Sequence, residues 1–294
     1  MIVSKQDRVL VQGITGKQGT FWTERMQEYG TTIVGGVNPK KAGTAHLGVP
    51  VFGSAVDAAS QLADAGSGVD VTVLFIPPAG ARAATEDAIA AGAKLIVVLT
   101  EFIPVHDTMA MIAAANDAGS RIIGPNTAGV VTPGEAFVGF MPAFDDRIFS
   151  PGPVGVISRS GSLGTLTAVE LSRAGIGQSA FLGIGGDPVS GTSTAEAFKA
   201  LDEDPKTEAI VVIGEIGGRK EEDAAAAIAA SAKPVVSFIA GAASPPGKRM
   251  GHAGAIVEGN TGTHASKKAA LTEAGATVVD VPSEIAAAVA DALG

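Results

Sequence analysis

The fold of the N-terminal half is indicated by the sequence Arg8-Val9-Leu10-Val11-Gln12-Gly13-Ile14-Thr15-Gly16-Lys17-Gln18-Gly19-Thr20. Residues 8–12 predict a buried parallel strand, the glycines a tight turn, and residues 21–29 a helix. Free backbone N–H groups and the helix dipole meet at such a turn, so it favours a bound anion. The glycine spacing is Gly-x-x-Gly-x-x-Gly, which departs from the dinucleotide fingerprint, and a purely structural turn is the alternative.

The segments that follow alternate between strand and helix. Strands are expected at 31–34, 71–76, 94–99 and 120–123, and helices at 81–91 and 107–118. Alternation at this spacing predicts a doubly wound parallel sheet. The apolar runs are as long as strands and far too short to span a membrane.

The end of the second strand carries Gly35-Gly36-Val37-Asn38-Pro39-Lys40-Lys41. A dinucleotide with a free ribose diol would need an acid at this point. The lysines instead favour a phosphorylated ribose, as in coenzyme A or NADP, and the residues leave both open. Two later loops, 77–79 and 99–104, lie at the same sheet edge, where an extended ligand would lie. Glu101 is either a ligand contact or the acid of a helix start.

The second half of the chain repeats the strand, turn and helix order. A strand at 154–157 leads into Ser158-Arg159-Ser160-Gly161-Ser162 and a helix over 163–173. Two hydroxyls and several N–H groups could hold a phosphoryl group there without a metal, and an ordinary N-cap is the alternative. The turn lacks the Gly-x-Ser-x-Gly order of a nucleophile elbow.

A histidine lies among glycines in Lys248-Arg249-Met250-Gly251-His252-Ala253-Gly254-Ala255. A strand over 209–213 delivers Glu215 to the same sheet edge, close to where Ser160 is expected. An imidazole there could accept phosphate on one nitrogen while the carboxylate holds the other. A histidine beside glycine is otherwise an ordinary loop residue, and that interpretation is the alternative.

Composition limits the remaining classes of function. The 294 residues are 46% hydrophobic, lack cysteine and carry a formal charge of −9. We therefore expect a cytoplasmic protein of two domains with no disulfide, no bound metal and no affinity for nucleic acid or membrane. The sequence lacks the Gly-x-x-x-x-Gly-Lys-Ser/Thr loop that binds the phosphates of ATP, so a phosphate donor is expected to bind another chain.

The motifs together resemble the α subunit of succinyl-CoA synthetase (succinate–CoA ligase) nearly end to end. The resemblance rests on residues 12–21, 34–37, 124–126, 158–161, 183–188, 214–218 and 247–256. It implies an α/β fold with a Rossmann-like, CoA-binding domain over 1–125, a linker over 126–153 and a flavodoxin-like ligase domain over 154–294. It also implies a β subunit with an ATP-grasp fold, in an αβ or α2β2 assembly, that binds ATP or GTP with Mg²⁺.

Residue roles follow from the same resemblance. His252 would carry phosphate, Glu215 would be its partner, and the turn Ser160-Gly161-Ser162 would point a helix N-terminus at the phosphate. The coenzyme A contacts would be Thr15, Gly16, Lys17, Gln18, Lys41, Leu99, Thr100 and Glu101. Phosphate would pass from the nucleotide to His252 and then to a carboxylic acid, and the acyl phosphate would be attacked by the thiol of coenzyme A.

Two positions depart from the family pattern. Thr127 stands where the family has Cys, and Thr165 where it has a Tyr near the acid substrate. Both changes would re-shape the acid pocket, so succinate is the default substrate and malate or another substituted dicarboxylate is the alternative. Two further alternatives are an NADP-dependent oxidoreductase, which leaves His252 unexplained, and a non-catalytic CoA-sensing subunit.

Overall fold

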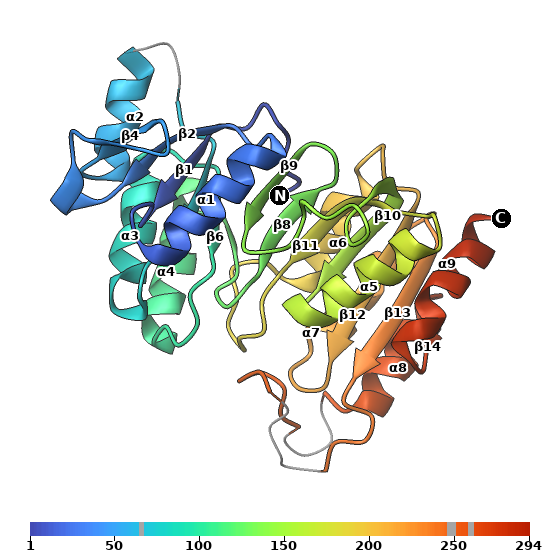
Figure 1. Ribbon diagram of the computed structural model, residues 1–294. Helices are drawn as coiled ribbons and strands as arrows, with labels where there is room; N and C mark the ends of the chain where they lie inside the picture. The colour runs from blue at the N-terminus through green and yellow to red at the C-terminus, as the bar shows by residue number, and fades with distance from the viewer. Residues whose placement is uncertain (65–67, 246–250, 258–261) are drawn as a thin grey trace.

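The computed structural model describes residues 1–64, 68–245, 251–257 and 262–294. It consists of two sheets with helices on both faces of each, so the predicted α/β class is confirmed (Figure 1). The first half contains β1 (Val9–Gln12), α1 (Lys17–Tyr29), β2 (Ile33–Val37), η1 (Pro39–Lys41), β3 (Ala45–His46), β4 (Val49–Phe52), α2 (Ala55–Asp64), β5 (Val71–Leu74), α3 (Pro78–Ala90), β6 (Leu95–Val98), α4 (Val105–Ala118) and β7 (Arg121–Ile123). None of the helices in the described residues is both long and apolar enough to cross a membrane.

The second half begins with two short strands and continues as alternating strands and helices. Its elements are β8 (Gly129–Thr132), β9 (Ala136–Gly139), β10 (Pro151–Ser158), α5 (Gly161–Arg173), β11 (Gln178–Gly183), α6 (Thr194–Asp202), β12 (Ala209–Glu215), α7 (Lys220–Ala230), β13 (Val235–Ala240), α8 (His264–Glu273), β14 (Thr277–Val279), η2 (Pro282–Glu284) and α9 (Ile285–Leu293). Both α1 and α5 begin earlier than predicted, directly after the turn residues Gly16 and Ser160. The predicted turns are therefore helix N-termini.

The first sheet has the strand order β3-β4-β2-β1-β5-β6-β7. Apart from β3, which pairs antiparallel with β4, the strands are parallel. Counted along the chain, the parallel strands follow the doubly wound order that reverses between β1 and β5. This order confirms the Rossmann-like prediction, and it places the carboxyl ends of β1 and β5 at the switch point where such sheets bind ligands.

The second sheet has the order β14-β13-β12-β10-β11-β8-β9. Its five parallel strands put the first of them, β10, between β11 and β12. That is the flavodoxin-like order, as predicted, with its switch point between β10 and β12. Ser158 ends β10 and Glu215 ends β12, so both lie at this point of the sheet.

The segment 126–153, which we expected to be a linker, contributes β8 and β9 to the second sheet. These strands form an antiparallel hairpin, and β8 pairs with β11. The glycines Gly129 and Gly139 face each other across the hairpin because a Cβ on either would lie within 2.8 Å of the other's Cα. Because the two strands approach so closely, the hairpin requires glycine at these positions, and the glycines do not indicate a linker here.

The helices divide between the faces of each sheet. In the first unit α2, α3 and α4 cover one face, while α1 lies on the other and packs against β9. In the second unit α5 and α9 share one face, and α6, α7 and α8 share the other. One continuous core runs from the α1 face of the first sheet into the second sheet, and a second core fills the α2–α4 face. The two units therefore meet through packed side chains.

Candidate functional site

The glycine turn after β1 is packed too closely for side chains. A Cβ on Gly13, whose φ is +80°, would lie 2.4 Å from the Phe75 carbonyl oxygen, and one on Gly19 would lie 2.2 Å from the Gly13 oxygen. Gly16 is the N-cap of α1 and supplies no side-chain cap. The first N–H groups of α1 are therefore open to an external acceptor, as an anion site requires.

Cationic and polar side chains surround this helix end. Lys17 is the first residue of α1, and Lys41 ends η1 after β2; both are exposed. The two segments are joined because Asn38 Nδ2 donates a hydrogen bond of 2.5 Å to Thr15 Oγ1. The structure thus brings together the predicted residues of the glycine turn and the lysine segment.

A cavity of about 590 Å³ opens beside the turn, at the switch point of the first sheet. Its walls come from α1, the ends of β5 and β6, and the segment after β9. The lining residues are Gln18, Trp22, Leu74, Phe75, Ile76, Pro77, Pro78, Leu99, Thr100, Glu101, Phe102 and Phe140. Four of the predicted contacts, Gln18, Leu99, Thr100 and Glu101, share this mainly apolar cavity. Its volume, its mainly apolar lining and its position beside the glycine turn suit an extended ligand whose anionic end lies at α1.

Sequence reasoning missed Phe102 in this wall. Its side chain is 79% exposed, and its backbone has a φ of +64°. A bulky residue in the left-handed region is strained, and such strain is found mainly where structure serves a ligand. The available signal was an aromatic residue within the loop 99–104, which was expected to lie where an extended ligand binds.

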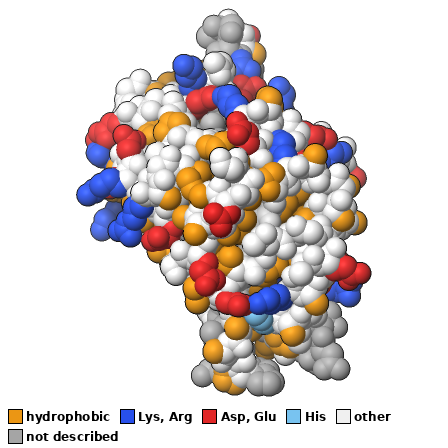
Figure 2. Space-filling model, turned by 90° about the vertical axis from the view of Figure 1, so that its right-hand side faces the viewer, with side chains coloured by type: hydrophobic (Ala, Val, Ile, Leu, Met, Phe, Trp, Pro, Cys, Tyr) orange, Lys and Arg blue, Asp and Glu red, His pale blue; other side chains and the backbone are white. Residues whose placement is uncertain are grey.

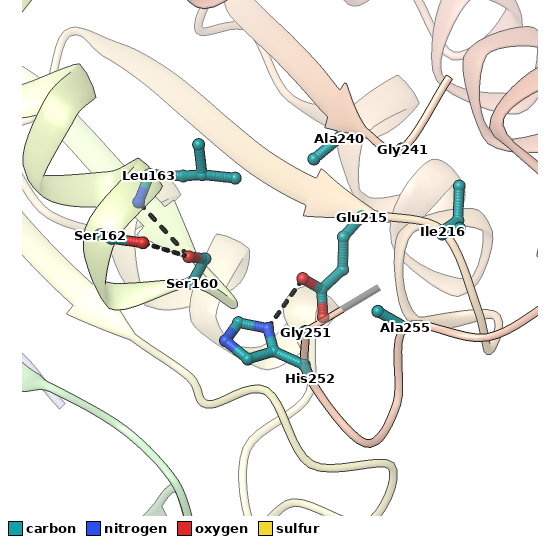
Figure 3. Close-up of a pocket in the computed structure, with 10 residues that line it drawn as sticks. All are labelled: Ser160, Ser162, Leu163, Glu215, Ile216, Ala240, Gly241, Gly251, His252 and Ala255. Atoms are coloured by element: carbon teal, nitrogen blue, oxygen red, sulfur yellow. Dashed lines mark hydrogen bonds and ion pairs between the residues drawn. The ribbon is translucent and has the colours of Figure 1, made fainter. Parts of the chain in front are cut away.

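A smaller cavity of about 250 Å³ lies at the switch point of the second sheet. Ser160, Ser162 and Leu163 of the α5 N-terminus form one side, and Glu215 with the segment around His252 forms the other (Figure 3). The three sites that the sequence predicted to converge thus share one cavity. Lys248, Arg249 and Met250 lie outside the described residues.

The His252 ring is held by one hydrogen bond and one glycine. Nδ1 lies 2.8 Å from Oε2 of Glu215, whose residue is only 6% exposed. A Cβ on Gly186 would lie 2.5 Å from the His252 Cγ, so the ring packs flat against that glycine. Figure 3 shows the ring between the carboxylate and the Ser160 end of α5, with its second nitrogen turned away from Glu215. That nitrogen, Nε2, is the one left to react.

The α5 N-terminus combines a cap with an open anion site. The Ser160 hydroxyl accepts from the Leu163 N–H at 3.3 Å and lies 3.2 Å from the Ser162 hydroxyl. Ser160 is therefore the N-cap that we considered as the alternative. The first turn contains no acidic residue, so no side chain of α5 itself neutralises the positive dipole end that faces the cavity. Gly161 is needed for packing, because a Cβ there would lie 2.9 Å from the Ala128 Cβ.

Charged residues from both cavities affect the pKa of the His252 imidazole. The hydrogen bond to Glu215 raises the pKa of His252 above its ordinary value of 6.5, burial and Arg159 lower it, and the charge of Glu101 raises it further. Glu101 lines the larger cavity. Glu101 therefore lines one cavity and affects the titrating group of the other.

We expect the His252 imidazole to titrate above pH 6.5 and to accept an electrophile only as the pH rises through that midpoint. Because the folded-state pKa is raised, the Glu215 contact adds stability that is fully present below the unfolded pKa and is lost as pH rises through the folded pKa. A ¹⁵N NMR titration should show a lower midpoint in Glu215→Gln. Equal midpoints in the two proteins would contradict the assigned cause.

The two residues expected near an acid substrate use their hydroxyls internally. Thr127 is 3% exposed, donates to the Gly183 carbonyl and accepts from the Gly129 N–H at 2.9 Å. Thr165 donates to the Gly161 carbonyl at 2.8 Å. The residues lining the smaller cavity include neither threonine. That Thr127 and Thr165 contribute to the acid pocket therefore stays a prediction. Their contribution would be to the shape of the pocket, because their hydroxyls are already hydrogen-bonded to the main chain.

Comparisons with known proteins agree with the two-part architecture. Residues 4–102 match the model of the CoA binding domain, and residues 157–277 match that of CoA-ligase. The succinate–CoA ligase [ADP-forming] subunit alpha 2 of Archaeoglobus fulgidus is 49% identical over 293 residues, covering 100% of this chain and 99% of that protein. The chain belongs to the succinate–CoA ligase alpha-subunit family.

Members of the alpha-subunit family differ in the acid named. The ADP-forming sulfoacetate–CoA ligase subunit of Bilophila wadsworthia is 42% identical to this chain and covers 100% of it, with 99% of that protein matched. Among solved structures, an ATP citrate lyase of Methanothrix soehngenii shares the fold with a TM-score of 0.89 at 24% identity. The match covers 99% of this chain and 50% of the lyase chain.

Proposed function

We propose that this alpha subunit catalyses the ADP-forming ligation of a small carboxylic acid to coenzyme A through a phosphohistidine at His252. The observation that carries the proposal is the 2.8 Å contact between His252 Nδ1 and Glu215, made in a cavity that also holds the N-terminus of α5. A carboxylate that accepts the Nδ1 proton directs reaction to Nε2. An open helix N-terminus stabilises the phosphoryl group placed there.

The residues of the first unit fit coenzyme A. The uncapped α1 N-terminus with Lys17 and Lys41 would hold the anionic phosphates, and the apolar cavity up to Glu101 would hold the chain that leads toward His252. The glycines at this turn leave no room for side chains, which lets a pyrophosphate approach the backbone. Coenzyme A supplies the thiol that displaces phosphate from the acyl phosphate.

The phosphoryl group moves twice in the proposed reaction. It passes from the γ-position of the nucleotide to Nε2 of neutral His252, while Nδ1 stays hydrogen-bonded to Glu215. It then passes from Nε2 to an oxygen of the acid, which forms an acyl phosphate and regenerates the imidazole. Ser160 and Ser162 at the end of α5 provide hydroxyl and N–H donors for the transferred group.

The nucleotide is assigned to a partner. We propose a β subunit with an ATP-grasp fold that binds ATP and Mg²⁺, since the named relatives are ADP-forming alpha subunits. The His252 side chain is 28% exposed, and the partner would face the side of the chain that carries it. The assembly would be αβ or α2β2.

Succinate is the default acid, and sulfoacetate is a second candidate because a 42% identical relative is named for it. Thr127 and Thr165 would shape the pocket wall through their methyl groups, as their hydroxyls bond to main-chain carbonyls.

Acyl-CoA formation should be measured with the complex of this chain and its β subunit across succinate, malate, sulfoacetate and acetate. We expect one dianionic acid to be preferred over acetate by roughly 100-fold in kcat/KM. Acetate has no second anionic group, so it would leave the charged or polar groups that bind this group in the pocket unpaired. Acyl-CoA formation from none of the four acids, in a complex that binds coenzyme A, would contradict the proposed function and support a CoA-sensing subunit.

A further inference from the structure

An arginine that carries no assigned role lies directly behind the Glu215 carboxylate. Arg159 follows β10, and its side chain is only 2% exposed. Its Nη2 lies 3.2 Å from Glu215 Oε1, whereas His252 contacts the other carboxylate oxygen, Oε2. Its Nη1 donates to the main-chain carbonyls of Glu215 at 3.3 Å and Gly217 at 3.1 Å. The guanidinium therefore contacts both the side chain and the backbone of the residue that holds the histidine.

Arg159 is itself fixed by a second buried ion pair. Its Nη1 lies 3.3 Å from Oε1 of Glu221, a residue of α7 that is fully buried. Glu221 in turn contacts the ammonium of Lys267, also fully buried, which donates to the Gly217 carbonyl at 2.9 Å. Oε1 of Glu221, the oxygen near Arg159, also accepts a hydrogen bond from the Glu215 N–H at 3.2 Å. Elements β10, β12, α7 and α8 thus meet in one network of two cations and two buried carboxylates.

The two Glu215 oxygens have different surroundings. Oε2 faces His252 Nδ1, whereas Oε1 is buried and has no hydrogen-bond donor in the described part of the chain. The charge of Arg159 is what compensates that oxygen for its lost water. A buried carboxylate without such a partner is costly, so removing the cation would favour a rotated or protonated Glu215.

The backbone next to the histidine packs on the same guanidinium. A Cβ on Gly254 would lie 3.0 Å from Arg159 Nη2, and the Gly254 N–H donates to the Gly186 carbonyl at 3.3 Å. Gly186 is the residue against which the His252 ring packs. Arg159 therefore contacts the carboxylate that holds the ring and lies against Gly254, whose backbone is hydrogen-bonded to the glycine that the ring packs on.

We infer that Arg159 is a positioning residue that, through Glu215, fixes the His252 ring with Nδ1 protonated and Nε2 free. Its importance for phosphoryl transfer rests on the proposed function, but its effect on the ring does not. The other charged groups that act on His252 are Glu215 and Glu101, which raise its pKa against the lowering effect of Arg159.

The conservative replacement Arg159→Lys is the informative variant. An ammonium keeps the charge but lacks the planar fork, so it cannot reach Glu215, Glu221 and two carbonyls together. Arg159→Gln removes the charge as well. The matched control is Arg173→Gln on the exposed end of α5, where the side chain is 72% exposed. Leu201→Ala, at a fully buried core position in α6, is the control for lowered stability alone.

The tautomer of neutral His252 should be read by long-range ¹H–¹⁵N NMR on the full chain labelled at its histidines. We expect Nδ1–H to dominate in the wild type and both controls, and the Nε2–H form to become populated in Arg159→Lys and to dominate in Arg159→Gln. In the complex with the β subunit, Arg159→Lys should phosphorylate about 10- to 100-fold more slowly.

An unchanged tautomer in a folded Arg159→Lys protein would overturn the inference, as would the same tautomer change in Leu201→Ala. If Arg159→Gln fails to fold, the lysine variant decides alone. A wild-type complex that never becomes phosphorylated would instead count against the proposed function, because the tautomer is measured without any turnover.

Discussion

Replacing His252 by Asn should lower acyl-CoA formation by about 10⁴-fold or more, because it removes the nitrogen that accepts the phosphoryl group. Asparagine is the suitable substitution because its amide N–H can still donate to Glu215 and the residue is not larger than the imidazole. The side chain is 28% exposed, and its hydrogen bond within the described residues is to Glu215, which the asparagine can keep, so we expect the variant to fold. Steady-state turnover with the β subunit measures the effect.

The matched control is His106→Asn on the exposed side of α4. It should turn over like the wild type, and both variants should bind coenzyme A with wild-type affinity, since neither changes a residue that lines the cavity proposed for coenzyme A. A His252→Asn complex that retains substantial turnover would show that phosphate reaches the acid without this histidine. The proposed mechanism would then be wrong even if the chain is part of a ligase.

Replacing Glu215 by Gln is expected to have the second largest effect, a loss of about 10²- to 10⁴-fold in turnover. The amide keeps the shape of the carboxylate but loses its charge. It can also turn its NH₂ group toward Nδ1, which would favour the His252 tautomer with Nε2 protonated and unable to accept phosphate. Because Glu215 is the residue whose hydrogen bond raises the pKa of His252, the pH at which turnover reaches half its maximum should also fall.

Glu203→Gln provides the same change at a side chain that is 67% exposed. It should leave both turnover and its pH dependence unchanged. Glu215→Gln with wild-type turnover would mean that the carboxylate is only a structural partner of Arg159. The combination of a lower rate and an unshifted pH profile would place the role of Glu215 in binding and not in holding the ring.

Much of this arrangement could be predicted from single residues and their positions in an alternating fold. Glu215 was expected at the carboxyl end of a strand and His252 in a glycine-rich turn, and parallel strands necessarily bring such ends to one edge. Both strand orders followed from the alternation and the family resemblance together. The residues alone left coenzyme A and NADP undecided, because a lysine-rich segment near 40–41 suits any phosphorylated ribose.

The features that sequence reasoning missed depend on contacts between distant segments. Arg159 would ordinarily be expected in solvent, and only the fold brings Glu215 and Glu221 from β12 and α7 against it. The strands β8 and β9 are four residues each, and their glycines resemble those of a linker until Gly129 and Gly139 are seen to pack on one another. Neither the burial of Arg159 nor the strand pair β8–β9 leaves a periodic pattern in the local sequence from which it could be recognised.

In the proposed mechanism His252 carries the phosphoryl group between nucleotide and acid. The most direct measurement is the intact mass of this chain in its complex with the β subunit after incubation with ATP and Mg²⁺, kept away from acid to preserve a phosphoimidazole. We predict one phosphoryl adduct on the wild-type chain, none on His252→Asn, and its loss when coenzyme A and the preferred acid are added together. An intact complex that forms no adduct, or an adduct that persists in His252→Asn, would contradict the claim.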